Sequence, residues 1–323
     1  MHNLKTVTHS KSLARAFAAF CALALSVGLA ACGSSSDSSS TNSNDPQMAG
    51  VTASGKLGKK PKISFHTPMQ VVNNSYAVLQ KGDGAQIQDG DRVCVQAVSI
   101  NAKDGGEMMS TWEKNTPDCS IVMNKKSLND MYYNVLKGQK IDSTVAFGVN
   151  DGNKSSTSYI MALTIVSRSK AVTRATGEKV TDVPANLPKV TLASDGAPSI
   201  DFNGYKPDGN LVAQTLIRGK GKQVAETDTV DVQYTGWVMD KDGKASKFDS
   251  SWDKGAPTQL SLQQVVKGWT QGLSGQTVGS QMLLVIPPEL GYGDKAQKGI
   301  PANSTLYFVV DLVYDYGPQQ SEQ

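Results

Sequence analysis

The stretch FDSSWDKGAP, residues 248–257, places one carboxylate between aromatic side chains. Asp249 follows Phe248 directly and precedes Trp252, on the expected return arm of a β-hairpin. The simpler interpretation is an edge charge that keeps a strand soluble. The alternative is a polar group set into an aromatic pocket, where a fixed dipole can stabilise a rearranging bond. The surrounding elements must decide between these two interpretations.

Few other residues could support acid–base, nucleophilic or metal chemistry. Beyond residue 31 the only histidine is His66, which disfavours a zinc site of the usual kinds. The sequence has no GxSxG elbow, and no Cys–His pair can form without His66, which disfavours hydrolysis by the common routes. DKDGK (240–244) resembles the start of a calcium loop, but Ser251 stands where the loop needs glutamate. We therefore expect a hairpin turn there, no metal and no cofactor.

The N-terminus resembles a bacterial lipoprotein signal. Residues 1–15 are basic, residues 16–30 are apolar, and LAAC ends at Cys32. The resemblance implies a signal peptide over 1–31, lipid on Cys32, and a protein anchored to the extracytoplasmic face of the cell membrane. Residues 32–47 are rich in Ser and Asn and predict a flexible tether with a span of roughly 20 Å.

The charge of the chain indicates no nucleic-acid partner. The full chain has 32 Lys and Arg against 29 Asp and Glu. Residues 1–31 contain three of these basic residues (Lys5, Lys11 and Arg15) and no acidic residue, so their removal makes the two numbers equal. A balanced surface carries no general attraction for a polyanion.

The body of the chain is an internal repeat. VLQKGDGAQIQDGDRVCVQ (78–96) aligns without a gap to TLIRGKGKQVAETDTVDVQ (215–233), and MMSTWEKNTP (108–117) aligns to FDSSWDKGAP. Two domains of ordinary size explain the length better than one large fold. We predict domains over 48–172 and 186–317, a linker over 173–185, and a disordered tail over 318–323.

Each repeat is predicted to be mostly β. In the second repeat Val230, Val232 and Tyr234 share one face at a period of two. MLLVIP (282–287) is a continuous apolar run suited to a central strand. Val265, Trp269 and Leu273 form one apolar stripe, which predicts a short helix laid on the sheet. Core filling is the simpler role for the tryptophan.

Five motifs of the second repeat resemble the FKBP-type peptidyl-prolyl cis-trans isomerases: VQYTGWV, FDSSWDKG, VVKGWTQGL, IPPELGYG and GIPANSTLYFVVDL. The resemblance covers about residues 215–316. It implies an α+β fold in which an antiparallel β half-barrel wraps a short α-helix, so that the chain would carry two tandem domains of this kind. The implied catalytic residues are Tyr234, Phe248, Asp249, Trp269, Tyr292 and Ile300, and the implied substrate-binding residues are Val265, Val266 and Phe308.

The resemblance also assigns roles. Trp269 would form the floor of an apolar pocket, and the Ile300 N–H and the Tyr292 hydroxyl would hold substrate carbonyls. Asp249, hydrogen-bonded to Tyr234, would orient dipoles toward a rotating X–Pro amide. The implied partners are proline-containing polypeptides and macrolides of the tacrolimus or rapamycin type. Lys254, where the family often has arginine, and Thr258, in place of an aromatic residue, bear on substrate preference and macrolide affinity.

The first repeat lacks these groups. Ala97 aligns to Tyr234, Met108 and Met109 align to Phe248 and Asp249, and Tyr132 lies near the place of Trp269. Two functions therefore stay open. One is an enzyme that isomerises X–Pro bonds of exported proteins during folding, with the second domain active. The other is a lipid-anchored chaperone or peptide-binding module without useful turnover.

Cys94 and Cys119 remain after Cys21 and Cys32 are assigned to the N-terminal signal. The repeat aligns them to Asp231 and Gln259, which we expect on the same outer face of neighbouring antiparallel strands. That position permits a disulfide, and an oxidising compartment favours one. Two free surface thiols are the alternative.

Overall fold

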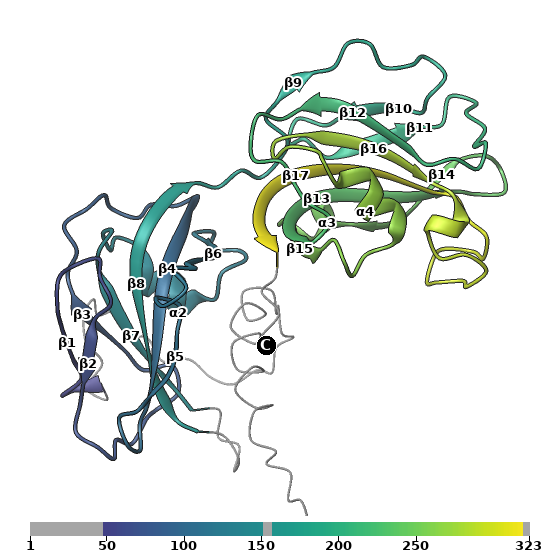
Figure 1. Ribbon diagram of the computed structural model, residues 1–323. Coiled ribbons are helices and arrows are strands. Elements are labelled where there is room, and N and C mark those ends of the chain that lie inside the picture. The colour runs from purple at the N-terminus through teal and green to yellow at the C-terminus, as the bar shows by residue number, and fades with distance from the viewer. Residues whose placement is uncertain (1–47, 151–156, 319–323) are drawn as a thin grey trace, which may run out of the picture. The chain divides into compact units, whose positions relative to one another are not determined.

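The computed structural model describes residues 48–150 and 157–318 (Figure 1). The chain divides between Ala171 and Val172 into two compact units, called here the first unit and the second unit. The expected signal peptide, the tether and Cys32 lie outside the described residues.

The first unit is built on a six-stranded antiparallel sheet. The strand order is β3-β7-β8-β4-β5, and β6 also pairs with β4. Period-two alternation directs Val93, Val95 and Ala97 of one strand into the core. The elements are β3 (Tyr76–Gln80), β4 (Asp91–Asn101), β5 (Glu107–Ser110), β6 (Asp118–Val122), α2 (Asp130–Leu136), β7 (Thr144–Val149) and β8 (Tyr159–Lys170).

The second unit has a seven-stranded sheet of the order β14-β13-β17-β16-β12-β9, with β15 also paired to β13. Apart from β9, this order repeats that of the first unit. Its strands are β9 (Glu178–Lys179), β12 (Val212–Arg218), β13 (Asp228–Met239), β14 (Ala245–Ser250), β15 (Thr258–Ser261), β16 (Gln281–Ile286) and β17 (Leu306–Pro318). Its short helices are α3 (Ser251–Lys254), α4 (Lys267–Leu273) and the 3-10 helix η2 (Pro288–Leu290).

Both faces of the second sheet are covered. Leu284 and Phe308 point to the face that packs against Trp269 and Leu273 of α4. Leu283 and Tyr307 point to the opposite face, where Phe202 packs. Every residue of β16 is buried, because this strand lies between β17 and β12 and has apolar cover on both sides. The continuous apolar run MLLVIP follows from this position.

Each unit also contains a separate two-stranded hairpin. In the first unit β1 (Thr52–Ser54) pairs with β2 (Lys62–Ser64). In the second unit β10 (Lys189–Leu192) pairs with β11 (Pro198–Asp201). Val190 and Ile200 of the second hairpin pack on the sheet face opposite α4.

Helix α4 is shorter than the apolar stripe predicts. It begins at Lys267, and Val266 is its extended N-cap residue, so Val265 lies outside the helix. Both valines still pack against the core that contains Trp269. No helix in the part of the chain that the structure describes is long and apolar enough to cross a membrane.

The segment that we expected to be a linker, 173–185, is part of the second unit. Its strand β9 pairs with Ile217 and Arg218 of β12. The Ala175 N–H donates to Asp311 Oδ2 at 2.8 Å, and Val183 packs in the core opposite α4. The segment has few large apolar residues because backbone hydrogen bonds hold most of it in place. We call residues 172–180 the lead segment.

We expect Asp311 to make the stability of the second unit depend on pH. Its side chain is 2% exposed, and burial raises its pKa above 3.8 although Ala175, Gln281 and Arg174 all favour the charged form. A raised carboxyl pKa means that the contribution of Asp311 to stability is greatest below pH 3.8 and is lost as the pH rises through the folded-state pKa.

We expect Asp311→Asn to remove this pH dependence, because asparagine stays neutral and keeps an acceptor for the Ala175 N–H. The melting temperature of the variant, relative to that of the wild type, should rise between pH 4 and pH 8. A constant difference across this range would contradict the assignment to Asp311.

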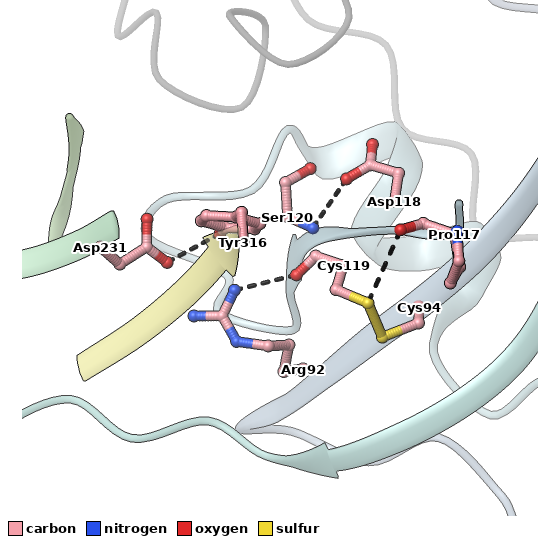
Figure 2. Close-up of a disulfide and its surroundings, with 8 residues drawn as sticks. All are labelled: Arg92, Cys94, Pro117, Asp118, Cys119, Ser120, Asp231 and Tyr316. Atoms are coloured by element: carbon pink, nitrogen blue, oxygen red, sulfur yellow. Dashed lines mark hydrogen bonds between the residues drawn. A yellow bond between two sulfur atoms is a disulfide. The ribbon is translucent and has the colours of Figure 1, made fainter. Parts of the chain in front are cut away.

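Cys94 on β4 and Cys119 on β6 form a disulfide in the first unit (Figure 2). Their Cα atoms are 4.0 Å apart. The aligned residues of the second unit, Asp231 and Gln259, are direct partners on β13 and β15. The Arg92 guanidinium donates to the Cys119 carbonyl at 2.9 Å and so also ties β6 to β4.

We expect residues 48–323 to show no reactive thiol when unfolded without reductant. The double variant Cys94→Ser/Cys119→Ser should lose roughly 3 kcal/mol of unfolding free energy, since the bridge closes a loop with a sequence separation of 25. Thiol titration and urea unfolding measure the two quantities. Two titratable thiols in the wild type would contradict the bridge.

Candidate active site

Four aromatic side chains from different elements meet on the α4 side of the second sheet. Tyr234 lies on β13, Phe248 on β14, Trp269 on α4 and Phe308 on β17. The Trp269 ring centroid lies 5.4 Å from that of Tyr234 and 5.2 Å from that of Phe308, edge to face in both pairs. Phe248 meets Phe308 edge to face at 5.4 Å. This geometry is the one that aromatic quadrupoles favour.

The solvent exposure of the side chains increases from the base of the cluster to its outer side. Trp269 is only 4% exposed and forms its base. Phe248, Val265 and Val266 are half-buried and pack against the same core. Tyr292 is 39% exposed. A ligand with an apolar ring could therefore contact the cluster from its open side while Trp269 stays in the core.

Gly236 makes room for this cluster and was not singled out by the sequence analysis. A Cβ atom there would lie 2.6 Å from both Phe248 Cζ and Phe308 Cε1. A glycine inside a strand often marks such a close contact. The repeat could have pointed to Gly236, because the corresponding residue of the first unit is Ser99 and not a glycine.

Asp249 faces this cluster and is held by three groups. The Tyr234 hydroxyl donates to Asp249 Oδ2. Lys254 Nζ lies 2.9 Å from Asp249 Oδ1, and the Ser250 N–H donates to the same oxygen at 2.9 Å. Of the two interpretations of this aspartate, the position in an aromatic site matches the structure.

Electrostatics keep Asp249 charged and Tyr234 protonated. Burial opposes ionisation of Asp249, but the hydrogen bonds from Tyr234 and Lys254 outweigh it, so the pKa of Asp249 lies below its ordinary value. Burial, followed by the bond to Asp249, raises the pKa of Tyr234. The pair therefore holds a fixed dipole at the open side of the site.

The loop between β16 and β17, residues 287–305, carries Tyr292 and Ile300. The side chain of Ile300 is buried in the same core as Trp269. Its N–H, however, donates to the Gln297 carbonyl at 3.0 Å. The expected role of this N–H as a carbonyl-binding group conflicts with that bond, because the turn that contains Ile300 already occupies the donor.

Val266 supplies the free donor that Ile300 lacks. Its N–H donates to no group in residues 48–150 and 157–318. It precedes the first residue of α4, where helix geometry leaves N–H groups without partners. The sequence did not reveal this, because the donor depends on where α4 begins. The Tyr292 hydroxyl likewise bonds to no group in the described ranges.

The corresponding position in the first unit keeps the scaffold without the polar pair. The Ala97 N–H donates to Thr111 Oγ1 at 2.8 Å, as the Tyr234 N–H donates to Ser251 Oγ at 2.8 Å. Met109 pairs with Ser99 in the register in which Asp249 pairs with Gly236. A hydroxyl and a carboxylate are thus replaced by alanine and methionine.

An aromatic contact does persist in the first unit. The Tyr132 ring centroid lies 4.9 Å from that of Phe147. Burial raises the pKa of the Tyr132 hydroxyl to about 12. Tyr132 is half-buried and packs against the core of the first unit, at the place that the buried Trp269 takes in the second unit.

Comparison with known proteins gives this site a family. Residues 220–313 match the family described as FKBP-type peptidyl-prolyl cis-trans isomerase. The "FK506-binding protein" of Streptomyces anulatus is 38% identical over 120 residues, which are 36% of this chain and 94% of that protein. The chain belongs to the FKBP-type peptidyl-prolyl cis-trans isomerase family. Its fold is the mostly antiparallel sheet with few helices that this membership implies.

Longer FKBP-type relatives share only this part. "FKBP-type peptidyl-prolyl cis-trans isomerase FkpA" of Escherichia coli (strain K12) is 46% identical over 103 residues, which are 32% of this chain and 37% of that protein. A solved structure, "Crystal structure of FkpA from Escherichia coli", covers 40% of this chain and 52% of that chain, with 40% identity and a TM-score of 0.31. The chain thus spans little more than a third of the length of the FkpA relative.

Proposed function

We propose that the second unit is a peptidyl-prolyl cis-trans isomerase that acts on X–Pro bonds of exported proteins during folding. The observation that carries the proposal is the aromatic cluster on Trp269, with the Asp249–Tyr234 dipole at its open side. The named FKBP-type relatives support the same activity.

The proposed mechanism needs no proton transfer and no covalent bond to the protein. Amide resonance sets a barrier of ~18–20 kcal/mol to rotation about a peptide bond. The planar amide is more charge-separated than the twisted form, so an apolar surface favours the twisted form. Phe248, Phe308 and Trp269 would hold the proline ring, and Asp249 would orient the Tyr234 dipole toward the rotating carbonyl.

Two donors would anchor the flanking chain. The Val266 N–H and the Tyr292 hydroxyl are free to donate hydrogen bonds to substrate carbonyls. Holding the residues on both sides of the proline would let the binding energy oppose the planar geometry. The half-buried Val265 and Val266 would contact the apolar side chain before the proline.

The test is the cis-to-trans rate of a proline tetrapeptide with residues 48–323. We expect a rate that increases linearly with protein concentration. Binding of the peptide without acceleration would favour the alternative, a chaperone or peptide-binding module. That alternative has its own support in the first unit, whose methionines provide an adaptable apolar surface.

We also propose that the first unit is a second, degenerate FKBP-like domain that holds or spaces clients near the active one. The shared strand order and the equivalent hydroxyl contacts of Thr111 and Ser251 support a common fold. A client held there would be present at a high effective concentration for the second unit.

For localisation we propose lipid anchoring at Cys32 on the extracytoplasmic face of the membrane. The LAAC motif and the Ser-rich tether support it. Cys32→Ser should release the protein from the membrane fraction or block its processing, because one thiol carries the lipid. Fractionation and intact-mass measurement check this. Unchanged membrane retention with no lipid mass on residue 32 would exclude the anchor.

A further inference from the structure

The hairpin β10–β11 and the lead segment both lie outside residues 220–313, which match the FKBP-type family. The hairpin turn nevertheless lies against both the lead segment and the helix next to the candidate site. Gly196, in the hairpin turn, has φ +101°. A Cβ atom on Gly196 would lie 2.9 Å from Arg174 Cδ and 3.0 Å from Trp252 Cη2. The hairpin turn, the lead segment and α3 therefore converge at one point.

Hydrogen bonds hold the lead segment to the hairpin turn and to β17 near Trp252. Arg174 Nη1 donates to the Ser194 carbonyl of the hairpin turn at 3.3 Å. The next residue, Ala175, is bound to Asp311 on β17. The Trp252 indole N–H is buried and bonds to no group among the residues that the structure describes. The indole ring lies against Gly196 of the hairpin turn.

Helix α3 connects this contact to the site. Its first residue, Ser251, accepts from the Tyr234 N–H and donates to Gln233. Its last residue, Lys254, is the ion-pair partner of Asp249. Gln233 is the register partner of Asp311, which holds the lead segment. A displacement of Trp252 would therefore move Lys254 relative to Asp249.

We propose that Gly196 and Arg174 are positioning residues, which set the place of α3 and, through Lys254, the orientation of Asp249. They touch no reacting atom themselves. The inference rests on the proposed isomerase function, since it assigns a catalytic consequence to contacts on the far side of α3. It extends the functional part of this chain beyond residues 220–313, which match the family described above.

In the first unit the glycine of the hairpin turn meets a different element. The turn of its hairpin β1–β2 places Gly58 against Asp142, where an added Cβ would lie 2.1 Å from Oδ1. Its tryptophan at the place of Trp252 is Trp112. The unit that lacks the Tyr–Asp pair thus directs its hairpin turn to a different position.

The test compares two glycines of the second unit in the full chain. Gly196→Ala adds left-handed strain and a clash with Trp252 and Arg174. Gly209→Ala adds strain at φ +86° but meets nothing within 4 Å. The readouts are kcat and KM for a proline peptide, the pKa of Asp249 from carboxyl NMR, and the melting temperature.

We expect Gly196→Ala to lower kcat by about tenfold, within the ~10²-fold that misplacement of a catalytic group by about 1 Å can cost. The pKa of Asp249 should rise as Lys254 moves away. Gly209→Ala should lose similar thermal stability while it keeps kcat and the pKa of Asp249. Equal kcat and pKa values in the two variants would overturn the proposal.

Arg174→Ala provides a second test without backbone strain, and it decides the matter if Gly196→Ala fails to fold. We expect a smaller drop in kcat and the same direction of change in the pKa of Asp249. Arg174→Met keeps the aliphatic part of the side chain. Its kcat and its Asp249 pKa should therefore lie closer to the wild-type values than those of Arg174→Ala. If the wild type does not accelerate isomerisation, the proposed function fails. The Asp249 titration still decides the positioning, and an unchanged pKa in both Gly196→Ala and Arg174→Ala would exclude it.

Discussion

Trp269→Ala is expected to lower the unfolding free energy of the second unit by about 3–5 kcal/mol and to abolish detectable isomerisation. The side chain is 4% exposed and meets the rings of Tyr234 and Phe308 edge to face. Its removal leaves a cavity under the site, and the rings of Tyr234 and Phe308 lose the side chain against which they pack. Urea unfolding measures the first effect, and the peptide assay measures the second.

The repeat offers a matched control for this variant. Tyr132→Ala removes the aromatic residue at the corresponding place in the first unit, where it contacts Phe147. It should destabilise the first unit and leave the isomerisation rate unchanged. A similar loss of activity in both variants would show that the site is not confined to the second unit.

Asp249→Leu separates the dipole from the apolar wall. The carboxylate is 40% exposed, so its loss should cost little stability. We expect a fall in kcat on the order of 10²-fold, comparable with the removal of one preorganised donor in other active sites. Full activity of this variant would disprove the role that we give to the Asp249–Tyr234 pair.

The second large effect concerns the two units expressed separately. Residues 172–323 should account for nearly all turnover, and residues 48–171 should fold without it. Ala97 has no hydroxyl, and Met108 and Met109 provide neither an aromatic wall nor an acid. The first unit also has a shorter loop at the place of the β16–β17 loop. Residues 150–158 separate β7 from β8, whereas residues 287–305 separate β16 from β17.

Circular dichroism and the peptide assay on both fragments test this prediction. The second fragment must begin at residue 172 rather than 186, because the lead segment binds Asp311. Comparable turnover by residues 48–171 would contradict the chemistry argued here, since that fragment has no residue equivalent to Asp249.

The sequence predicted most of what hydrophobic alternation and side-chain type control. The faces of β13, the central place of β16 and the meeting of Tyr234 with Asp249 all follow from the pattern or the motifs. Backbone hydrogen bonds were harder to predict. The start of α4 at Lys267 leaves the Val266 N–H free, and a separate turn occupies the Ile300 N–H with the Gln297 carbonyl.

The contacts of the lead segment and of the hairpin β10–β11 were likewise not predictable from the sequence. Residues 173–185 look like a linker because their place in the sheet rests on backbone donors such as Ala175 N–H, which no residue type reveals. The contact of Gly196 with Trp252 is equally invisible, since glycine at a turn is expected in any case. Only the three-dimensional position distinguishes a turn glycine from one that accommodates a neighbouring ring.

Strand β9 has a consequence for solubility. An edge strand exposes N–H and C=O groups that can pair with another chain. In the second unit β12 would be such an edge, but Glu178 and Lys179 of β9 pair with it and place two charged residues outermost. A chain cut after Lys179 would remove this cover from the Ile217–Arg218 end of β12. We expect such a chain to pair more readily with a second copy along this edge, a consequence of β9 that is separate from its part in the fold.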